Sequence, residues 1–443
     1  MNRQSNPLVR SVQKSLDDLP THGVPYFFTG GPKDNVLADW GHIQGLAYYR
    51  PDPLRPDMPN ITVIFSANHY YGAKDWTKPG VLRFYSLYSG NLLYKLELPT
   101  TKGTHPGGVQ VVGDYLVVPV EAQDKTPESA VYLYDLTLGK ESKEPVFTLK
   151  RAEKTGGAGL AKFGSGHVLV TYDNGHVTFY RSNGQPLGSP ELSFSAHGSV
   201  SLDETGHSSV NLVVEANEDN SEGQLYMIGL NRPDTKDLAV LYTVDLSEAE
   251  PAVEKVETVH FVTDKTDGIV GDAGVSFRWG AGVYIDPNAH LNLIASARNS
   301  SVGVAMTNAF TAESGEVNVL ATYKIAKHQK SRVTENFAMT GASEGRVQWA
   351  IEEVKPGVDL DAVSFSLMKD KKSANDKHEA KGLKSGSITA ANYGGSSHHL
   401  YIGELHYEYE GNTLKGKDAI KQLALNGDDE SQIPFIAFRS TNV

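Results

Sequence analysis

Short apolar runs separated by glycine-containing turns recur along most of this chain. The clearest example lies within Gly103–Glu121, where the apolar runs Val109–Val112 and Tyr115–Val120 flank the dipeptide Gly113-Asp114. A Gly-Asp pair between two valine-rich runs is typical of a tight β-hairpin turn. The pattern therefore predicts a buried hairpin at this position.

Variants of this hairpin open five repeats, which together reach about residue 325. Each repeat has a small-residue start, an inner apolar strand and a buried second strand. A third strand often alternates aromatic and polar residues, and a fourth is more polar where it is present. Four antiparallel strands graded from buried to exposed are typical of a β-propeller blade. The repeats open at His42, His105, Gly156, His207 and Trp279.

Glycines cluster near the starts of the predicted inner strands. Blades converge on the propeller axis there, so large side chains would collide with the neighbouring blade. The glycines that fit this requirement are Gly45, Gly107, Gly108, Gly157, Gly159, Gly280 and Gly282.

The two ends of the chain depart from the repeat. Apolar residues on one helical face predict a helix over Pro7–Leu19, and Pro25–Thr29 is a predicted strand. The lysine-rich segment Lys369–Lys384 predicts an exposed or disordered loop, and Asp418–Leu425 predicts a helix. Strand-like runs surround both segments. They form either a C-terminal β domain or part of a sixth blade, which the Pro25–Thr29 strand would close.

These observations predict an all-β protein with a β-propeller of five blades, or alternatively six. Residues 1–35 would form an N-terminal helix and strand that pack on the propeller, and residues 36–327 the propeller itself. Residues 328–443 would form a β-rich C-terminal domain or the closing blade.

Composition narrows the classes of partner. The net charge of -12 argues against nucleic acid, which is bound by clustered Lys and Arg. The 443 residues include no cysteine and no apolar run long enough for a membrane span. The N-terminus has no apolar core of a secretory signal. We expect a cytoplasmic protein if the chain is full-length, and a secreted or periplasmic one if a signal was removed.

The segments HPGGVQVVGDYLVVPVE (His105–Glu121) and GQLYMIGLN (Gly223–Asn231) resemble blades of bacterial β-propeller proteins. The repeated tryptophan-aspartate pairs of WD40 propellers and the spaced glycines of kelch propellers are missing. The resemblance covers the propeller region and implies the fold. It implies no activity, because propellers serve as hydrolases, lyases, lectins and scaffolds alike.

Propeller geometry also predicts which side chains meet near the axis. The start of each inner strand and the end of the antiparallel second strand lie on the same face. We therefore expect polar side chains from both positions to gather there. Strand starts contribute His42, His105, His207 and Trp279, and second-strand ends contribute His69, Glu121, Asp173, Asn231 and Arg298.

This set supports several kinds of chemistry. His42, His105 and His207 could bind a divalent metal ion or act as bases, with Glu121 or Asp173 as a further ligand or proton acceptor. The other four residues would bind ligand: Trp279 and Arg298 could stack on a sugar or grip a carboxylate, with His69 and Asn231 beside them. A structural interpretation competes, because strand-start histidines often bond a neighbouring blade and strand-end acids often cap turns.

We predict from these features that the axial face recognises a small molecule or a glycan. The first alternative is a metal-assisted hydrolase or lyase that uses the axial His, Glu and Asp residues. The second is a scaffold that binds protein across the propeller face. The C-terminal region would pack against the propeller or associate with a protein partner.

Overall fold

The computed structural model describes most of the chain up to residue 311 and, beyond it, the backbone of separate strands. The described residues are 3–29, 42–50, 62–68, 79–86, 92–99, 104–122, 129–263, 275–286, 289–298, 304–311, 318–324, 337–339, 346–352, 362–368, 377–383, 385–389, 398–402, 406–409, 412–414 and 435–441. The chain divides into two compact units. The first comprises Met1–Gly23, Phe28–Tyr85 and Asn91–Ser314, and the second comprises Val24–Phe27, Ser86–Gly90 and Gly315–Val443. The predicted domain boundaries stay a prediction.

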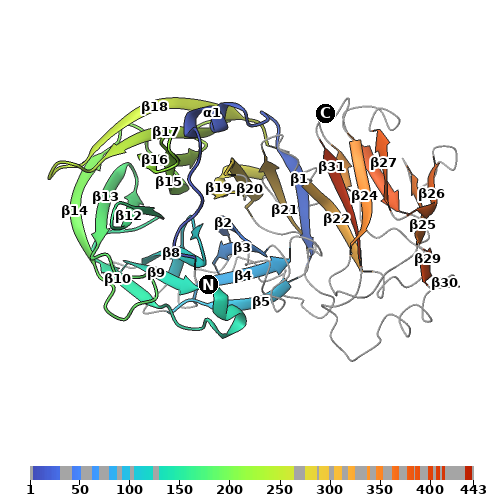
Figure 1. The fold of residues 1–443 in the computed structure, drawn as a ribbon, viewed down its shortest axis with the longest axis horizontal. Coiled ribbons are helices and arrows are strands. Elements are labelled where there is room, and N and C mark those ends of the chain that lie inside the picture. The colour runs from blue at the N-terminus through green and yellow to red at the C-terminus, as the bar shows by residue number, and fades with distance from the viewer. Residues whose placement is uncertain are drawn as a thin grey trace. The chain divides into compact units, whose positions relative to one another are not determined.

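The first unit consists of antiparallel sheets (Figure 1). One has the order β10-β9-β8-β6, and β7 also pairs with β8: β6 (Thr104–Pro106), β7 (Gln110–Val112), β8 (Tyr115–Ala122), β9 (Ser129–Asp135) and β10 (Phe147–Arg151). The next contains β11 (Gly157–Phe163), β12 (Gly166–Asp173), β13 (His176–Ser182) and β14 (Phe194–Ser201). The third contains β15 (Ser209–Ala216), β16 (Glu222–Asn231), β17 (Asp237–Asp245) and β18 (Ala252–Phe261).

A further sheet joins the first and last repeats of this unit. Its strands are β2 (Ile43–Tyr49), β3 (Thr62–Ala67), β4 (Val81–Ser86), β5 (Leu92–Glu97), β19 (Val275–Ile285), β20 (Leu291–Ala297) and β21 (Val304–Phe310). Inner strand β19 pairs in parallel with inner strand β2 through Ala281 and Gly45. A parallel bridge between Gly108 and Gly157 links two other repeats in the same manner.

Antiparallel meanders whose first strands lie beside one another in a ring form a β-propeller. The all-β propeller fold predicted from the sequence is therefore confirmed. Counting the joined sheet as two blades would give five, and the number of blades stays a prediction.

The predicted hairpin is confirmed as β7 and β8. Gly113, in the turn, has a φ of 58°, a left-handed conformation that favours glycine. The predicted crowding of the inner strands is also present. A Cβ atom on Gly107 would lie 1.8 Å from the carbonyl oxygen of Gly156, and one on Gly282 would lie 1.9 Å from that of Leu46. Neither position can hold a side chain without moving the neighbouring repeat.

The buried side chain of Gln110 links three inner strands. Its Oε1 accepts hydrogen bonds from the backbone N–H groups of Leu160 (2.9 Å) and Leu212 (3.1 Å). Its Nε2 donates to the carbonyl oxygen of Leu212 at 2.8 Å. One amide thus ties β7 to β11 and β15.

Residues 3–9 run along the end at which the inner strands turn back. Arg3 pairs with Asp114 in the β7–β8 turn (Nη2–Oδ1 2.9 Å), and Val9 bridges to Glu215 near the end of β15. Figure 1 shows this blue segment crossing the ring on its way to α1. The starts of the inner strands lie at the opposite end.

The N-terminal helix is shorter than predicted. Helix α1 spans Val12–Asp17, whereas the prediction was Pro7–Leu19. The side chain of Ser11 caps it by accepting from the backbone N–H of Lys14. Pairing of Val9 with β15 holds the preceding residues out of the helix.

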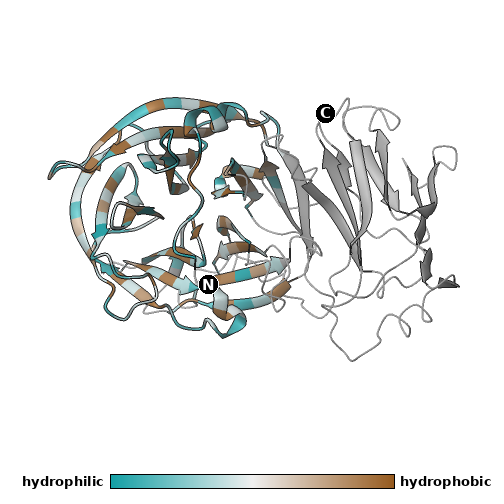
Figure 2. Cartoon of the chain, in the orientation of Figure 1, coloured by the Kyte–Doolittle hydropathy of each residue, from teal (hydrophilic) through white to brown (hydrophobic). Residues whose placement is uncertain are grey.

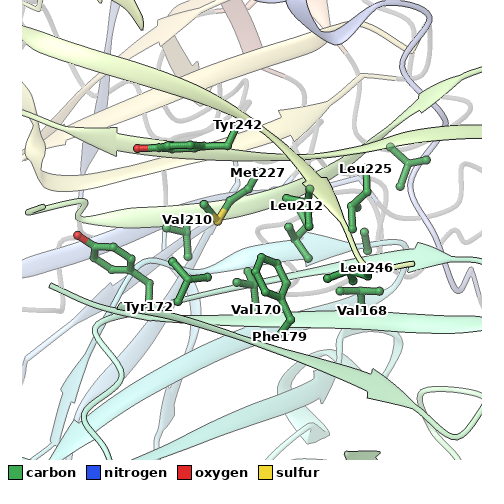
Figure 3. Packing of buried hydrophobic residues seen from close by; sticks show 14 of the residues in the cluster. Val168, Val170, Tyr172, Phe179, Val210, Leu212, Leu225, Met227, Tyr242 and Leu246 are labelled. Atoms are coloured by element: carbon green, nitrogen blue, oxygen red, sulfur yellow. The ribbon is translucent and has the colours of Figure 1, made fainter. Parts of the chain in front are cut away.

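Apolar side chains pack between neighbouring sheets of the first unit. Figure 3 shows one such layer, in which Val170 and Phe179 lie with Val210, Leu212 and Met227 of the next sheet. In Figure 2, hydrophobic and hydrophilic positions are mixed along the outer strands β14 and β18, most of whose residues are exposed or partly exposed. The inner strand β2 is buried throughout.

The second unit is also built from strands. They are β22 (Asn318–Lys324), β23 (Phe337–Met339), β24 (Arg346–Glu352), β25 (Ala362–Met368), β26 (Lys377–Leu383), β27 (Ser385–Thr389), β28 (His398–Ile402), β29 (His406–Tyr409), β30 (Asn412–Leu414) and β31 (Phe435–Thr441). Strand β1 (Val24–Thr29) confirms the strand predicted at Pro25–Thr29. The predicted helix at Asp418–Leu425 lies outside the described residues.

Two sequence predictions for this region were wrong. The repeats were predicted to reach about residue 325, but β21 is the third strand of the last repeat and β22 pairs with β31. Adjacency in sequence favoured the wrong partner. The predicted loop Lys369–Lys384 contains β26, which pairs with β25 alone. An edge strand tolerates charged residues, so the lysines did not prevent it.

Among the described residues, no helix is long and apolar enough to cross a membrane.

Candidate functional site

Side chains from the start of the ring gather around His42, which directly precedes β2. The His42 and His105 rings stack with centroids 6.4 Å apart, and Trp279 meets His42 edge-on at 5.2 Å. The backbone holds the group together, because Ile43 donates to the carbonyl oxygen of Arg298 at 2.7 Å. We call these residues the His42 cluster: His42, His105, Glu121, Arg278, Trp279 and Arg298.

Two arginines share the indole of Trp279. The guanidinium carbons of Arg278 and Arg298 each lie 5.0 Å from the ring centroid. Both contacts are of cation–π type, which holds a cation without cancelling its charge. Arg278 is exposed, while Trp279 and Arg298 are partly exposed. The cluster therefore presents positive charge to solvent.

A buried carboxylate fixes the backbone beneath these arginines. Asp237, at the start of β17, is 2% exposed. Its Oδ1 accepts from the backbone N–H of Phe277 (2.7 Å) and from the hydroxyl of Ser276 (3.0 Å). The Ser276 hydroxyl in turn accepts from the backbone N–H of Arg278 at 3.1 Å. These bonds set the irregular stretch of β19 that places Arg278 and Trp279.

His42 is neutral at physiological pH. Burial lowers its pKa to about 3, and unfavourable electrostatic interaction with nearby His105, Arg298 and Arg278 adds to this effect. Its ring makes no hydrogen bond with any residue that the structure describes, and its buried Nε2 has no partner. Such a group costs about 1–3 kcal/mol of desolvation unless something binds it.

His105 and Glu121 form a cross-strand pair between β6 and β8. His105 Nδ1 lies 3.6 Å from Glu121 Oε2, and Lys154 Nζ lies 2.9 Å from Glu121 Oε1. The proximity of His105 and the contact with Lys154 lower the pKa of Glu121, although burial opposes them. Glu121 is therefore an ionised carboxylate whose charge Lys154 already balances.

His207 belongs to a separate, buried group. Its Nε2 lies 3.0 Å from the hydroxyl of Tyr242, which donates to Glu204 Oε2 at 3.2 Å, and Lys255 pairs with Glu204. The backbone N–H of His207 donates to the Tyr172 hydroxyl at 3.1 Å. Burial lowers the pKa of His207 to about 4. We call these five residues the His207 cluster.

Three predicted site residues belong to neither the His42 cluster nor the His207 cluster. Asp173 ends β12 and acts electrostatically on Lys154, raising its pKa after the larger effect of Glu121. Asn231 is buried at the end of β16, where its Nδ2 donates to the Thr205 carbonyl at 3.4 Å. His69 lies outside the described residues.

The predicted metal site has no support in the described part of the chain. No group of three or more His, Asp or Glu side chains there is arranged to hold a metal ion. His42 and His105 come together, but His207 is engaged with Tyr242 instead. The metal stays an untested prediction.

Sequence analysis missed Arg278, Lys154 and Asp237. Arg278 directly precedes Trp279 in the sequence, so a wider window around that residue would have included it. The sequence around Lys154 and Asp237 does not indicate a site residue, because each contacts the site from a neighbouring repeat.

No protein-family model matches the chain, and no curated protein matches it. Solved structures similar to it include a mutant of the GH43 protein BlXynB from Bacillus licheniformis (9% identity, 94% of this chain and 96% of that one, TM-score 0.38). A thermostable family-43 glycoside hydrolase covers 64% of this chain and 91% of its own (14% identity, TM-score 0.34). The Dos1 propeller covers 60% and 54% (9% identity, TM-score 0.30). TM-scores this low carry no argument, so the fold rests on the sheet topology of the chain itself.

Proposed function

We propose that the His42 cluster binds a small polar ligand, such as a sugar or another metabolite. The observation that carries this proposal is the environment of His42. Its buried Nε2 has no hydrogen-bond partner, yet it lies beside the partly exposed Trp279 and two arginines. A ligand that supplies a hydrogen bond there would satisfy the imidazole and contact the indole and guanidinium groups together.

Contrast with His207 supports the same proposal. His207 bonds to Tyr242, and a Cβ on Gly229 would lie only 2.6–2.7 Å from its ring atoms. That histidine is enclosed by protein and has a structural role. The His42 cluster instead keeps exposed polar groups at the start of the ring, the end that residues 3–9 do not cross.

The test is a binding screen with a variant of the exposed aromatic. Wild-type protein is titrated calorimetrically with neutral sugars, acidic sugars, sugar phosphates and amino acids. Trp279→Leu should weaken the binding of any ligand found by about 5-fold, since an aromatic contact contributes roughly 1 kcal/mol. Phe194→Leu is the matched control, because Phe194 is partly exposed on outer strand β14. Equal affinities in wild type and Trp279→Leu would contradict the proposal.

A second candidate is general base catalysis by His105, oriented by Glu121. The distance of 3.6 Å between His105 Nδ1 and Glu121 Oε2 favours it, since a carboxylate commonly orients a histidine base. Glu121→Gln would then lower kcat for a hydrolysed sugar ester or glycoside about 100-fold while KM changes little. An unchanged kcat would exclude this role.

The scaffold alternative has less in its favour. It requires a contiguous exposed apolar patch. Among the side chains that the structure describes, the exposed large apolar residues are few and belong to different elements: Leu93 on β5, Leu138 on the 3₁₀ helix Leu136–Glu141, and Val256 and Val262 on or after β18. A protein partner of the C-terminal region stays a prediction.

A further inference from the structure

We infer that the ligand of the His42 cluster carries an anionic oxygen group, a carboxylate or a phosphate, which Arg278 and Arg298 bind. This inference rests on the proposed function and adds the chemical class of the ligand. It follows from the charges around the cluster, from the way the two arginines are held, and from the neutral state of His42.

The His42 cluster has more positive than negative charge. Arg278 and Arg298 both lie against one indole, which has no net charge of its own. The acid of the cluster, Glu121, is already in contact with Lys154 at 2.9 Å and near His105. Glu121 therefore balances Lys154 and does not balance the exposed Arg278 guanidinium, whose positive charge can meet a ligand.

Arg278 differs from three other arginines of the first unit in having no acid partner that the structure describes. Arg3 pairs with Asp114, Arg151 with Glu153 and Arg232 with Asp237. Among the described residues, no carboxylate pairs with the Arg278 guanidinium. Arg10 also has no acid partner among the described residues, but Arg278 differs from it in lying against Trp279 beside a second arginine. Guanidinium groups bind carboxylate and phosphate through two parallel hydrogen bonds.

The backbone at Arg278 and Arg298 is held in place before any ligand binds. The backbone of Arg278 is fixed through Ser276 and the buried Asp237, and the carbonyl oxygen of Arg298 accepts from Ile43 in β2. The two cations are thus carried by neighbouring strands of one sheet, β19 and the end of β20. Groups held in place before binding lose less conformational entropy when a ligand arrives.

His42 is suited to form a hydrogen bond with an uncharged group of the ligand. A protonated imidazole beside two guanidinium groups would add a third charge, whereas a neutral one offers a donor and an acceptor. The burial and the cationic neighbours that keep His42 neutral therefore equip it to bond a hydroxyl or carbonyl of the ligand. An anionic sugar supplies both the acid for the arginines and hydroxyls for His42.

The experiment compares ligands that differ only in the anionic group. Calorimetric titrations of the full chain use glucose, glucuronate and glucose 6-phosphate at low salt, and the titration with the tighter anion is repeated in Arg278→Gln, Arg298→Gln and Arg10→Gln. Arg10 is an exposed arginine between Val9 and α1, away from the cluster, so its variant controls for overall charge. We expect an anion to bind about 10- to 100-fold more tightly than glucose. That preference should fall about 10-fold in Arg278→Gln and stay unchanged in Arg10→Gln.

The outcomes separate this inference from the proposed function. Preference for glucuronate assigns the carboxylate, and preference for glucose 6-phosphate assigns the phosphate. Equal binding of all three ligands, lost in Trp279→Leu, would overturn the inference and leave the proposed function standing. An anion preference that survives both cluster substitutions would also overturn it. Binding of no anion, while a neutral ligand from the wider screen binds at Trp279, would overturn the inference alone. Absence of any ligand in that screen would overturn both.

Discussion

Two histidines at corresponding positions of the repeat have opposite surroundings in this protein. His42 and His207 both stand at the start of an inner strand, and burial lowers the pKa of each. His207 is bonded to Tyr242 and enclosed by Gly229 and Tyr172. His42 makes ring contacts with His105 and Trp279 and leaves its Nε2 without a partner.

The different surroundings of His42 and His207 show that the position within the repeat does not decide the role of a residue. The neighbouring repeats decide it. The Tyr242 hydroxyl bonds the Nε2 of His207 and the Tyr172 ring packs against the imidazole, so His207 stabilises the packing between two sheets. Cations and an indole surround His42, so it is left able to interact with a ligand. The predictions below separate these two roles by their effects on stability and on binding.

The largest expected effect is the loss of stability in acid. The pKa of His207 is about 4 in the folded state, below the 6.5 of a free histidine. The unfolded chain therefore gains its proton first as the pH falls, so the stabilising contribution is complete above pH 6.5 and is lost toward pH 4. This loss amounts to at most about 3 kcal/mol. Urea unfolding at several pH values should show it. His207→Gln should remove the share of His207, while the share of His42, whose pKa is lowered to about 3, remains. An unchanged fall would contradict the assignment.

Removing each imidazole comes next in size. His207→Ala should lower the free energy of unfolding at pH 7 by about 2 kcal/mol, because it opens a cavity and leaves the Tyr242 hydroxyl without one partner. His42→Ala should cost less than about 1 kcal/mol, because its ring makes no hydrogen bond within the described residues. Urea denaturation of the two variants makes the comparison directly. Equal losses would erase the distinction between the clusters.

A smaller effect is expected at the hydroxyl that satisfies His207. Tyr242→Phe removes the bonds to His207 and Glu204 and should cost about 1 kcal/mol. Tyr134 supplies a matched control, since it is fully buried and its hydroxyl has no hydrogen-bond partner among the described residues. Tyr134→Phe should change the free energy of unfolding by less than about 0.5 kcal/mol. A larger loss in Tyr134→Phe than in Tyr242→Phe would contradict this account.

Much of the fold could be predicted because its signals are local. Apolar runs and the Gly113 turn define the β7–β8 hairpin within a few residues. Glycines such as Gly107 reveal where backbones approach closely, as the contact with Gly156 shows. The strand pairing of β22 could not be predicted, because its partner β31 lies far along the chain.

The candidate site could be predicted only in part, for the same reason. The geometry of the repeat put His105 and Glu121 in one set, and the two are cross-strand neighbours because they belong to one pair of adjacent strands. It could not separate His42 from His207, because that depends on Tyr242, Arg278 and Arg298. These residues reach the histidines through tertiary packing, which leaves no periodic trace in the sequence.

The most direct test of the difference between the two clusters is nuclear magnetic resonance of the histidine rings. The protein is labelled with ¹³C at histidine Cε1, and the His42, His105 and His207 signals are assigned by single substitutions. Glucuronate and glucose 6-phosphate are then titrated into separate samples at pH 7. The account predicts that at least one of these anions shifts the His42 and His105 signals in a saturable manner, while the His207 signal stays in place. Saturable shifts of His207 alone, or no shift of His42 and His105 with either anion, would contradict it.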